Sequence, residues 1–153
     1  MKNRLVQSIQ EKLPEYEKTI LEAIDLFVYQ KERYKVEYTM AIGASVADVD
    51  MLAFEGLIRK TDGFICLEEN LCVIVFAFND QGQGIKAASN MLNKFEMQYF
   101  GKHIYLGIIN SQEEPKAEKQ VKKLFETLCY GILNGMSNTP LDYEEISSLK
   151  SSR

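Results

Sequence analysis

Two short apolar runs on either side of a polar triplet constrain the fold of this chain most strongly. The runs FIC and LCVIVF flank Glu68, Glu69 and Asn70. β-Rich arms around residues that tolerate a tight turn are typical of a β-hairpin. We therefore predict hairpin strands at residues 63–67 and 71–78, with the triplet at the tip.

The rest of the chain alternates between helical and extended patterns. Apolar residues that recur every three or four positions predict helices, and short continuous apolar runs predict buried strands. Helices are expected at residues 14–33, 46–60, 84–99 and 115–134, strands at 36–44 and 103–109, a loop at NDQGQG, and a short helix before Pro14.

Taken in order, the elements after the first helix read β-α-β-β-α-β-α. The split βαβ, or ferredoxin-like, arrangement has this core order. Right-handed crossovers then place the helices on one face of a mixed, mostly antiparallel sheet. The sequence thus predicts an α+β fold with a ferredoxin-like β-α-β-β-α-β core and an added N-terminal helix.

We divide the chain into an N-terminal extension, a single domain and a polar tail, at residues 1–13, 14–140 and 141–153. A length of 153 residues suits one domain with its own core. The tail LDYEEISSLKSSR is polar and is expected to fray, apart from a docking of Leu141 and Tyr143.

Charge and hydropathy exclude several classes of partner. The formal net charge is −4 and no basic block is present, which argues against binding to a nucleic-acid duplex. No apolar run approaches the roughly 20 residues needed to span a bilayer. The N-terminus MKNRLVQSIQEK lacks the apolar centre of a secretory signal, so a cytoplasmic location is expected.

Cysteines and histidine do not form a recognisable metal or nucleophile motif. Cys66 and Cys72 lie in the apolar arms of the hairpin, where buried thiols are the ordinary interpretation. The chain has no CxxC pair, and His103 is its single histidine. A zinc site and a catalytic centre built on histidine are therefore disfavoured, and we predict no cofactor or metal.

Several local strings, in this order along the chain, resemble GGDEF domains, the diguanylate cyclases of bacterial cyclic di-GMP signalling. In the register of that family, residues 68–72 (EENLC) occupy the five signature positions, and residues 62–76 run without a gap against its strand–signature–strand segment. The resemblance extends over residues 13–138 and implies a nucleotidyl cyclase-like fold. Its other matching positions are Leu13, Pro14, Leu128, Tyr130 and Asn138.

The chain departs from this family at the positions that serve catalysis. Glu68 and Glu69 replace two glycines that let the backbone approach the nucleotide. Leu71 replaces an acidic residue, and a leucine cannot hold Mg²⁺, which takes oxygen ligands. The first strand, AIGAS, lacks the family's metal-binding Asp, and Leu133 replaces a phosphate-contacting Lys. The resemblance therefore implies a degenerate domain that is not an enzyme.

An RxxD motif, Arg59 to Asp62, precedes the signature positions by five residues. In the family this motif is the inhibitory site that binds the product, cyclic di-GMP. A guanidinium can donate two hydrogen bonds to guanine O6 and N7, and a carboxylate can accept from the opposite side of the base edge. The resemblance thus implies a cyclic di-GMP receptor, for which Arg33 is a weaker candidate as an additional arginine. Helix capping and solvation give the same motif a purely structural interpretation.

Other functions stay open at this point. A protein–protein adaptor without nucleotide, or a homodimer, would use the helices or the hairpin end. Glu68, Glu69 and Asn70 are either a plain turn or a partner contact. A divergent metal-dependent nucleotide enzyme would use Asp48 and Asp50 together with the two glutamates, although the two aspartates also suit a helix start.

Overall fold

The computed structural model describes residues 2–46, 49–78 and 80–151, so Asp48 lies outside the described residues. The helices are α1 (Lys2–Glu11), α2 (Leu13–Ala23), α3 (Asp25–Tyr34), the 3-10 helix η1 (Met51–Leu57), α4 (Gln81–Gln98), α5 (Ala117–Leu133) and α6 (Tyr143–Ser151). The strands are β1 (Tyr38–Ala44), β2 (Gly63–Glu68), β3 (Leu71–Ala77), β4 (Tyr105–Asn110) and β5 (Pro140–Asp142).

The strands form one sheet in the order β2-β3-β1-β4-β5. β1 pairs antiparallel with β3 and β4, and β2 and β3 form the hairpin. β5 pairs with β4 in parallel. The predicted hairpin and the predicted α+β core order are therefore confirmed.

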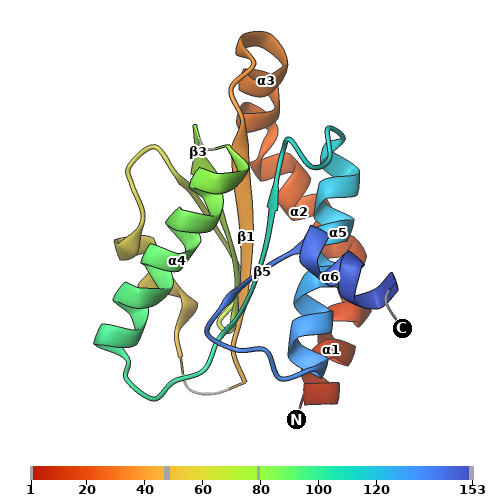
Figure 1. The fold of residues 1–153 in the computed structure, drawn as a ribbon. Coiled ribbons are helices and arrows are strands. Elements are labelled where there is room, and N and C mark those ends of the chain that lie inside the picture. The colour runs from red at the N-terminus through yellow and green to blue at the C-terminus, as the bar shows by residue number, and fades with distance from the viewer. Residues whose placement is uncertain (1, 47–48, 79, 152–153) are drawn as a thin grey trace.

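Helices cover both faces of this sheet (Figure 1). The two crossover elements of the core, η1 and α4, share one face, as predicted. The helices outside that core, α1, α2 and α5, pack on the opposite face. The central strands β1, β3 and β4 are buried along their full length, which is the burial expected of a sheet covered on both sides.

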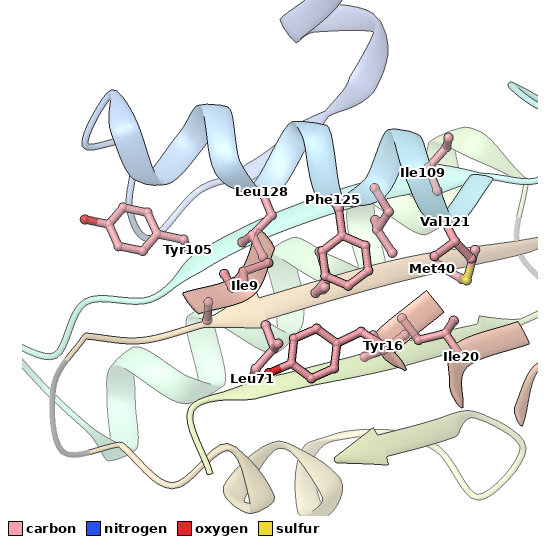
Figure 2. Close-up of a cluster of buried hydrophobic side chains, with 14 of the residues drawn as sticks. Ile9, Tyr16, Ile20, Met40, Leu71, Tyr105, Ile109, Val121, Phe125 and Leu128 are labelled. Atoms are coloured by element: carbon pink, nitrogen blue, oxygen red, sulfur yellow. The ribbon is translucent and has the colours of Figure 1, made fainter. Parts of the chain in front are cut away.

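The larger apolar cluster lies between the sheet and the α1, α2 and α5 layer (Figure 2). Alternate residues of each central strand enter it, because successive side chains of a strand point to opposite faces. In Figure 2, Tyr16 from α2 and Leu71 from β3 lie next to each other below α5. The labelled members are Ile9, Tyr16, Ile20, Met40, Leu71, Tyr105, Ile109, Val121, Phe125 and Leu128.

The predicted single helix at 14–33 is two helices that meet at Ile24. This residue has φ −90° and ψ 2°, which ends α2 and begins α3. Ile20 and Ile24, which recur at helical spacing, are fully buried. By contrast, α3 contains no fully buried residue and extends past the end of the sheet, at the top of Figure 1.

Two further predicted elements differ from the structure. Instead of a helix at 46–60, the described part of that segment contains the short 3-10 helix η1, which Asp50 caps by accepting from the Leu52 amide at 2.9 Å. The predicted loop NDQGQG already contains the start of α4. Asp80 caps this helix by accepting from the Gln83 amide, and the Gln83 side chain accepts from the Asp80 amide in turn.

The tail is ordered as far as residue 151, where the described residues end, contrary to the fraying that its polarity suggested. Residues 140–142 form β5, in which Leu141 is 3% exposed, and α6 follows directly and packs on α5. The docking of Leu141 is thus confirmed. No helix within the described residues is long and apolar enough to cross a membrane.

Candidate functional site

The RxxD motif closes the base of the hairpin through a dense set of hydrogen bonds. The Asp62 Oδ1 atom accepts from the Ala77 amide at 3.0 Å and from Arg59 Nη2 at 3.1 Å. Its Oδ2 atom accepts from the Arg59 amide at 2.9 Å and from Arg59 Nε at 3.4 Å. The Arg59 Nη2 atom also donates to the Ala77 carbonyl at 2.6 Å. The motif therefore ties the start of β2 to the end of β3.

The two members of this motif differ sharply in exposure. The Asp62 side chain is 2% exposed, whereas the Arg59 side chain is 56% exposed. A carboxylate has about four lone-pair sites, and four donors from this chain occupy those of Asp62. The guanidinium of Arg59 is thus the part of the motif that a ligand can reach.

The hairpin tip lies at the opposite end of β2 and β3 and is held by the N-terminal helices. Glu68 Oε1 accepts from the Tyr16 hydroxyl at 3.0 Å and from Lys12 Nζ at 3.2 Å. These two bonds lower the pKa of the Glu68 carboxyl. Burial and the neighbouring Glu68 raise the pKa of Tyr16 to about 12. Glu68 therefore anchors the tip to the junction of α1 and α2.

The remaining tip residues bind the segment that follows β1. The Glu69 carbonyl accepts from the Met51 amide at 3.1 Å. The Asn70 carbonyl accepts from the Ser45 amide at 3.1 Å, and the Asn70 side chain donates to the Ser45 carbonyl at 3.2 Å. Leu71, at the fourth signature position, is 2% exposed and belongs to the larger apolar cluster. The tip is thus held by the junction of α1 and α2 and by the segment that follows β1.

Metal-ligating side chains do not converge in the described residues. No group of three or more His, Cys, Asp or Glu residues there is arranged to hold a metal ion. His103 is exposed, with its Nδ1 atom 3.2 Å from the Ser137 hydroxyl. Arg33 lies at the end of α3, where its guanidinium carbon is 5.9 Å from the centre of the Tyr34 ring. The described hydrogen bonds of Asp62 come from Arg59 and Ala77, so Arg33 is not part of that network.

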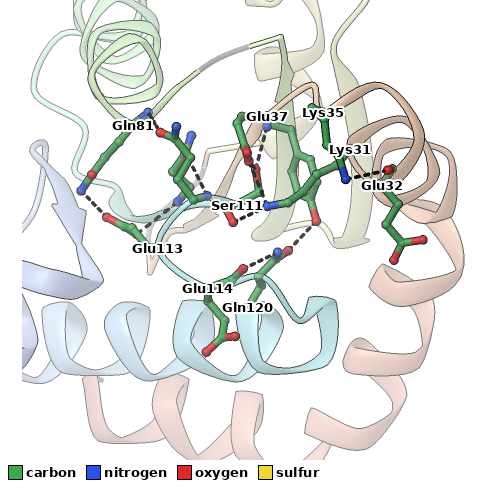
Figure 3. A network of polar contacts seen from close by, with 12 residues as sticks. Lys31, Glu32, Lys35, Glu37, Gln81, Ser111, Glu113, Glu114 and Gln120 are labelled. Carbon is green, nitrogen blue, oxygen red and sulfur yellow. Dashed lines mark hydrogen bonds and ion pairs between the residues drawn. The ribbon is translucent and has the colours of Figure 1, made fainter.

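A polar cluster that the sequence did not predict lies beyond the ends of β4 and β5. The Gln81 side-chain amide donates to carboxylates of Glu113, Asp142 and Glu144 at 2.5, 3.3 and 3.2 Å. Figure 3 shows the Gln81–Glu113 bond beside a second network, in which Lys31 donates to Glu37 and to the Ser111 carbonyl. The acidic residues come from a loop and from a tail that was expected to fray, so no local pattern could reveal their convergence.

The carboxyl of Glu113 is the most perturbed acid of this cluster. Burial, then the hydrogen bond to Asp142 and the charge of Asp142, raise its pKa from 4.5 to about 8. The amide of Asn110, which donates to Glu113 at 3.2 Å, opposes this shift. Two carboxyl groups this close bind one proton readily, because the shared proton removes a charge repulsion.

This shift predicts a stability that falls as the pH rises. The folded protein holds the Glu113 proton more tightly than the unfolded chain, so the stabilisation is complete below about pH 4.5 and disappears as the pH passes about 8. Between pH 6 and 8.5 the free energy of unfolding should decrease by about 2 kcal/mol less in Glu113→Gln than in the wild type. Urea denaturation at each pH measures the free energy of unfolding of both proteins.

Glu126→Gln, a substitution of an exposed acid on α5, is the matched control and should leave the slope as in the wild type. Equal slopes in the wild type and Glu113→Gln would show that Glu113 is ionised in the folded protein at neutral pH.

Comparisons with known proteins identify the fold. No protein-family model and no curated protein matches the sequence. Among solved structures, a microbial GGDEF domain studied with cyclic di-GMP matches at a TM-score of 0.65 and 8% identity, over 82% of this chain and 92% of that one. The GGDEF domain of TpbB from Pseudomonas aeruginosa matches at 0.63 and 11% identity, over 85% and 88%.

A third match is the GGDEF domain of DgcB from Caulobacter crescentus in complex with cyclic di-GMP, at a TM-score of 0.63 and 7% identity, over 84% of this chain and 90% of that one. Each match covers more than four fifths of both chains, so the similarity is that of a domain and not of a single motif. At these identities the similarity establishes architecture. The chain has the nucleotidyl cyclase-like fold of GGDEF domains, as the resemblance in its sequence indicated.

Proposed function

We propose that this protein is a GGDEF-like regulatory domain without diguanylate cyclase activity. The observation that carries the proposal is the burial of Leu71. Its side chain, at the fourth signature position, is 2% exposed and packs in the apolar cluster beneath the N-terminal helices. An acidic metal ligand at this position would have to leave that cluster, and this conflict supports the absence of a catalytic role.

The neighbouring positions support the same conclusion. Phosphoryl transfer depends on metal ions and cations that neutralise developing charge. Glu68 is engaged by Lys12 and Tyr16, and the backbone of Glu69 and Asn70 is engaged by the segment after β1. The tip therefore serves to join elements of the fold, with no glycine pair for the approach of a nucleotide.

The test for activity uses GTP or ATP with Mg²⁺ or Mn²⁺ and separates the nucleotides by chromatography. We expect no cyclic di-GMP and no other turnover above the protein-free control. Metal-dependent turnover that disappears in Asp48→Ala or Glu69→Ala would establish the divergent enzyme instead and overturn the proposal.

A second candidate function is the binding of cyclic di-GMP at the hairpin base. The favouring observation is the exposed Arg59 guanidinium, held in place by a carboxylate whose acceptor sites are filled. In this version Arg59 contacts a guanine or phosphate oxygen, and Asp62 orients the guanidinium. Two of the structurally similar GGDEF domains were studied together with cyclic di-GMP.

Calorimetric titration with cyclic di-GMP tests this second function. We expect binding in the wild type and a loss of at least tenfold in affinity in Arg59→Ala, about 1.4 kcal/mol, because a charged hydrogen bond to the ligand disappears. Lys60→Ala removes a neighbouring exposed cation and should bind as the wild type does. Arg33→Ala tests whether α3 supplies the additional arginine.

Absence of binding by the wild type would refute the receptor version and leave the regulatory domain as a protein–protein adaptor or a homodimer. A structurally similar cyclase, SiaD from Pseudomonas aeruginosa, was solved in complex with its activator SiaC. This chain covers 57% of that chain, and its TM-score to it is 0.59 at 8% identity. A protein partner is therefore the next candidate in that case.

A further inference from the structure

Two cysteines face each other across the strands of the hairpin. Cys66 on β2 and Cys72 on β3 are directly opposite partners in the antiparallel register. Residues in this relation project from the same face of a sheet. Cys66 is exposed and Cys72 is fully buried, and both are free thiols in the structure. The third cysteine, Cys129, lies on α5.

The backbone geometry of this pair is compatible with a disulfide. Opposite residues of antiparallel strands have Cα atoms about 4.5–5.5 Å apart, and disulfides form at Cα separations of about 4.4–6.8 Å. The register shifts between Cys66 and Glu68, so a bulge adjoins one member of the pair. β2 is also an edge strand. A small shift that closes the distance between the two Cβ atoms therefore displaces no second strand.

Each of the two thiols has a contact that it gives up when the disulfide forms. The Cys66 thiol donates to the Glu68 carbonyl at 3.4 Å, a weak bond that is easily replaced. Cys72 pairs with Gly43 on its other side, and a Cβ atom placed on Gly43 would lie 3.8 Å from the Cys72 sulfur. The Cys72 sulfur therefore lies close to Gly43 on the β1 side, and it has to turn toward β2 before it can bond to Cys66.

We propose that Cys66 and Cys72 form a reversible disulfide when the protein reacts with hydrogen peroxide. The Cys66 thiolate attacks one oxygen of hydrogen peroxide and the O–O bond breaks, which gives a sulfenic acid and a hydroxide. The hydroxide takes up the proton that the Cys66 thiol had released, and the first water forms. The Cys72 thiolate then attacks the Cys66 sulfur, the S–O bond breaks, and the departing hydroxide takes a proton to form a second water. Two thiol sulfurs are oxidised and both peroxide oxygens are reduced.

Exposure decides the order of these steps, because peroxide reaches Cys66 and not the buried Cys72. Burial and the carboxylates of Asp50, Glu68, Glu55 and Glu69 raise the pKa of the Cys66 thiol. Burial raises the pKa of Cys72 to about 12. Since the thiolate is the nucleophile, we expect the oxidation rate to rise about tenfold per pH unit below the pKa of Cys66.

The experiment uses the full chain with Cys129→Ser, so that two cysteines of the three remain. The reduced protein is treated with hydrogen peroxide, denatured, alkylated with iodoacetamide and weighed by mass spectrometry. We expect both alkylations to be lost, a cross-link between the peptides of Cys66 and Cys72, and full recovery with dithiothreitol. Cys66→Ser in the same background should keep its single alkylation.

Three results would overturn the proposal. Two alkylations after peroxide treatment would show that no disulfide forms. Sulfinic or sulfonic acid on Cys66, with Cys72 still alkylated, would show that the buried thiol does not resolve the sulfenic acid. A covalent dimer through Cys66 would show that the pairing is between chains. The thermal midpoint of each variant confirms that the compared proteins are folded.

Discussion

We expect Leu71→Asp to lose most or all of its folding stability and to gain no metal binding. Leu71 is 2% exposed and lies in an apolar cluster with Tyr16 and Ile9. The substitution loses the burial of a large side chain and brings a carboxylate into that cluster, which together cost at least about 4 kcal/mol. This is a large part of the roughly 5–15 kcal/mol that stabilises a typical domain.

Leu71→Met is the matched control, because it preserves volume and polarity and should cost less than about 1.5 kcal/mol. Urea denaturation measures both variants, and calorimetry with Mg²⁺ follows on any folded Leu71→Asp protein. A stable Leu71→Asp protein that binds Mg²⁺ would show that an acidic side chain fits a metal site at this position, and the argument from the packing of Leu71 would fail.

Asp62→Ala is expected to destabilise the protein far more than Arg59→Ala. The substitution removes the acceptor of two backbone amides, those of Arg59 and Ala77, from a position that is 2% exposed. The Ala77 amide belongs to a residue that is 2% exposed and is left without an acceptor at a cost of about 1–3 kcal/mol, whereas the Arg59 amide is exposed and can bond to water. A loss of up to about 3 kcal/mol is therefore expected. Arg59→Ala removes a side chain that is more than half exposed, and its ion pair should contribute less than about 1 kcal/mol.

Chemical denaturation of both variants decides whether the motif holds the hairpin base. Asp62→Asn keeps an acceptor oxygen and should lie between the wild type and Asp62→Ala. Equal losses for Arg59→Ala and Asp62→Ala would contradict a structural role centred on the carboxylate. Because Asp62→Ala changes stability, Arg59→Ala is the better variant for ligand titrations.

The parts of the fold that the sequence predicted are those encoded by local patterns. The apolar arms around residues 68–70 predicted the hairpin, and its strands end within one residue of the predicted limits. The order of the core elements followed from the same kind of pattern. Local sequence could not predict the break at Ile24, since an apolar helical face continues through it and neither glycine nor proline marks the position.

The features that were missed depend on packing between distant segments. The tail has a polar composition, yet Leu141 is buried and its strand pairs with β4. Glu113 and Asp142 are brought together only because β4 and β5 run in parallel. At the RxxD motif, the sequence identified the two residues but did not decide between ligand binding and a structural role. The structure places Asp62 inside the hairpin base and Arg59 at the surface.

The two edges of the sheet are unequal, which has a consequence for self-association. An open edge strand is a template for strand addition from another chain and thus for aggregation. β5 covers residues 106–108 of β4, a strand that is apolar along most of its length. At the other edge, β2 carries a bulge and ends in the charged Glu68, features that discourage a flat pairing. The short strand β5 therefore covers the β4 edge, which is the edge more prone to pair with another chain.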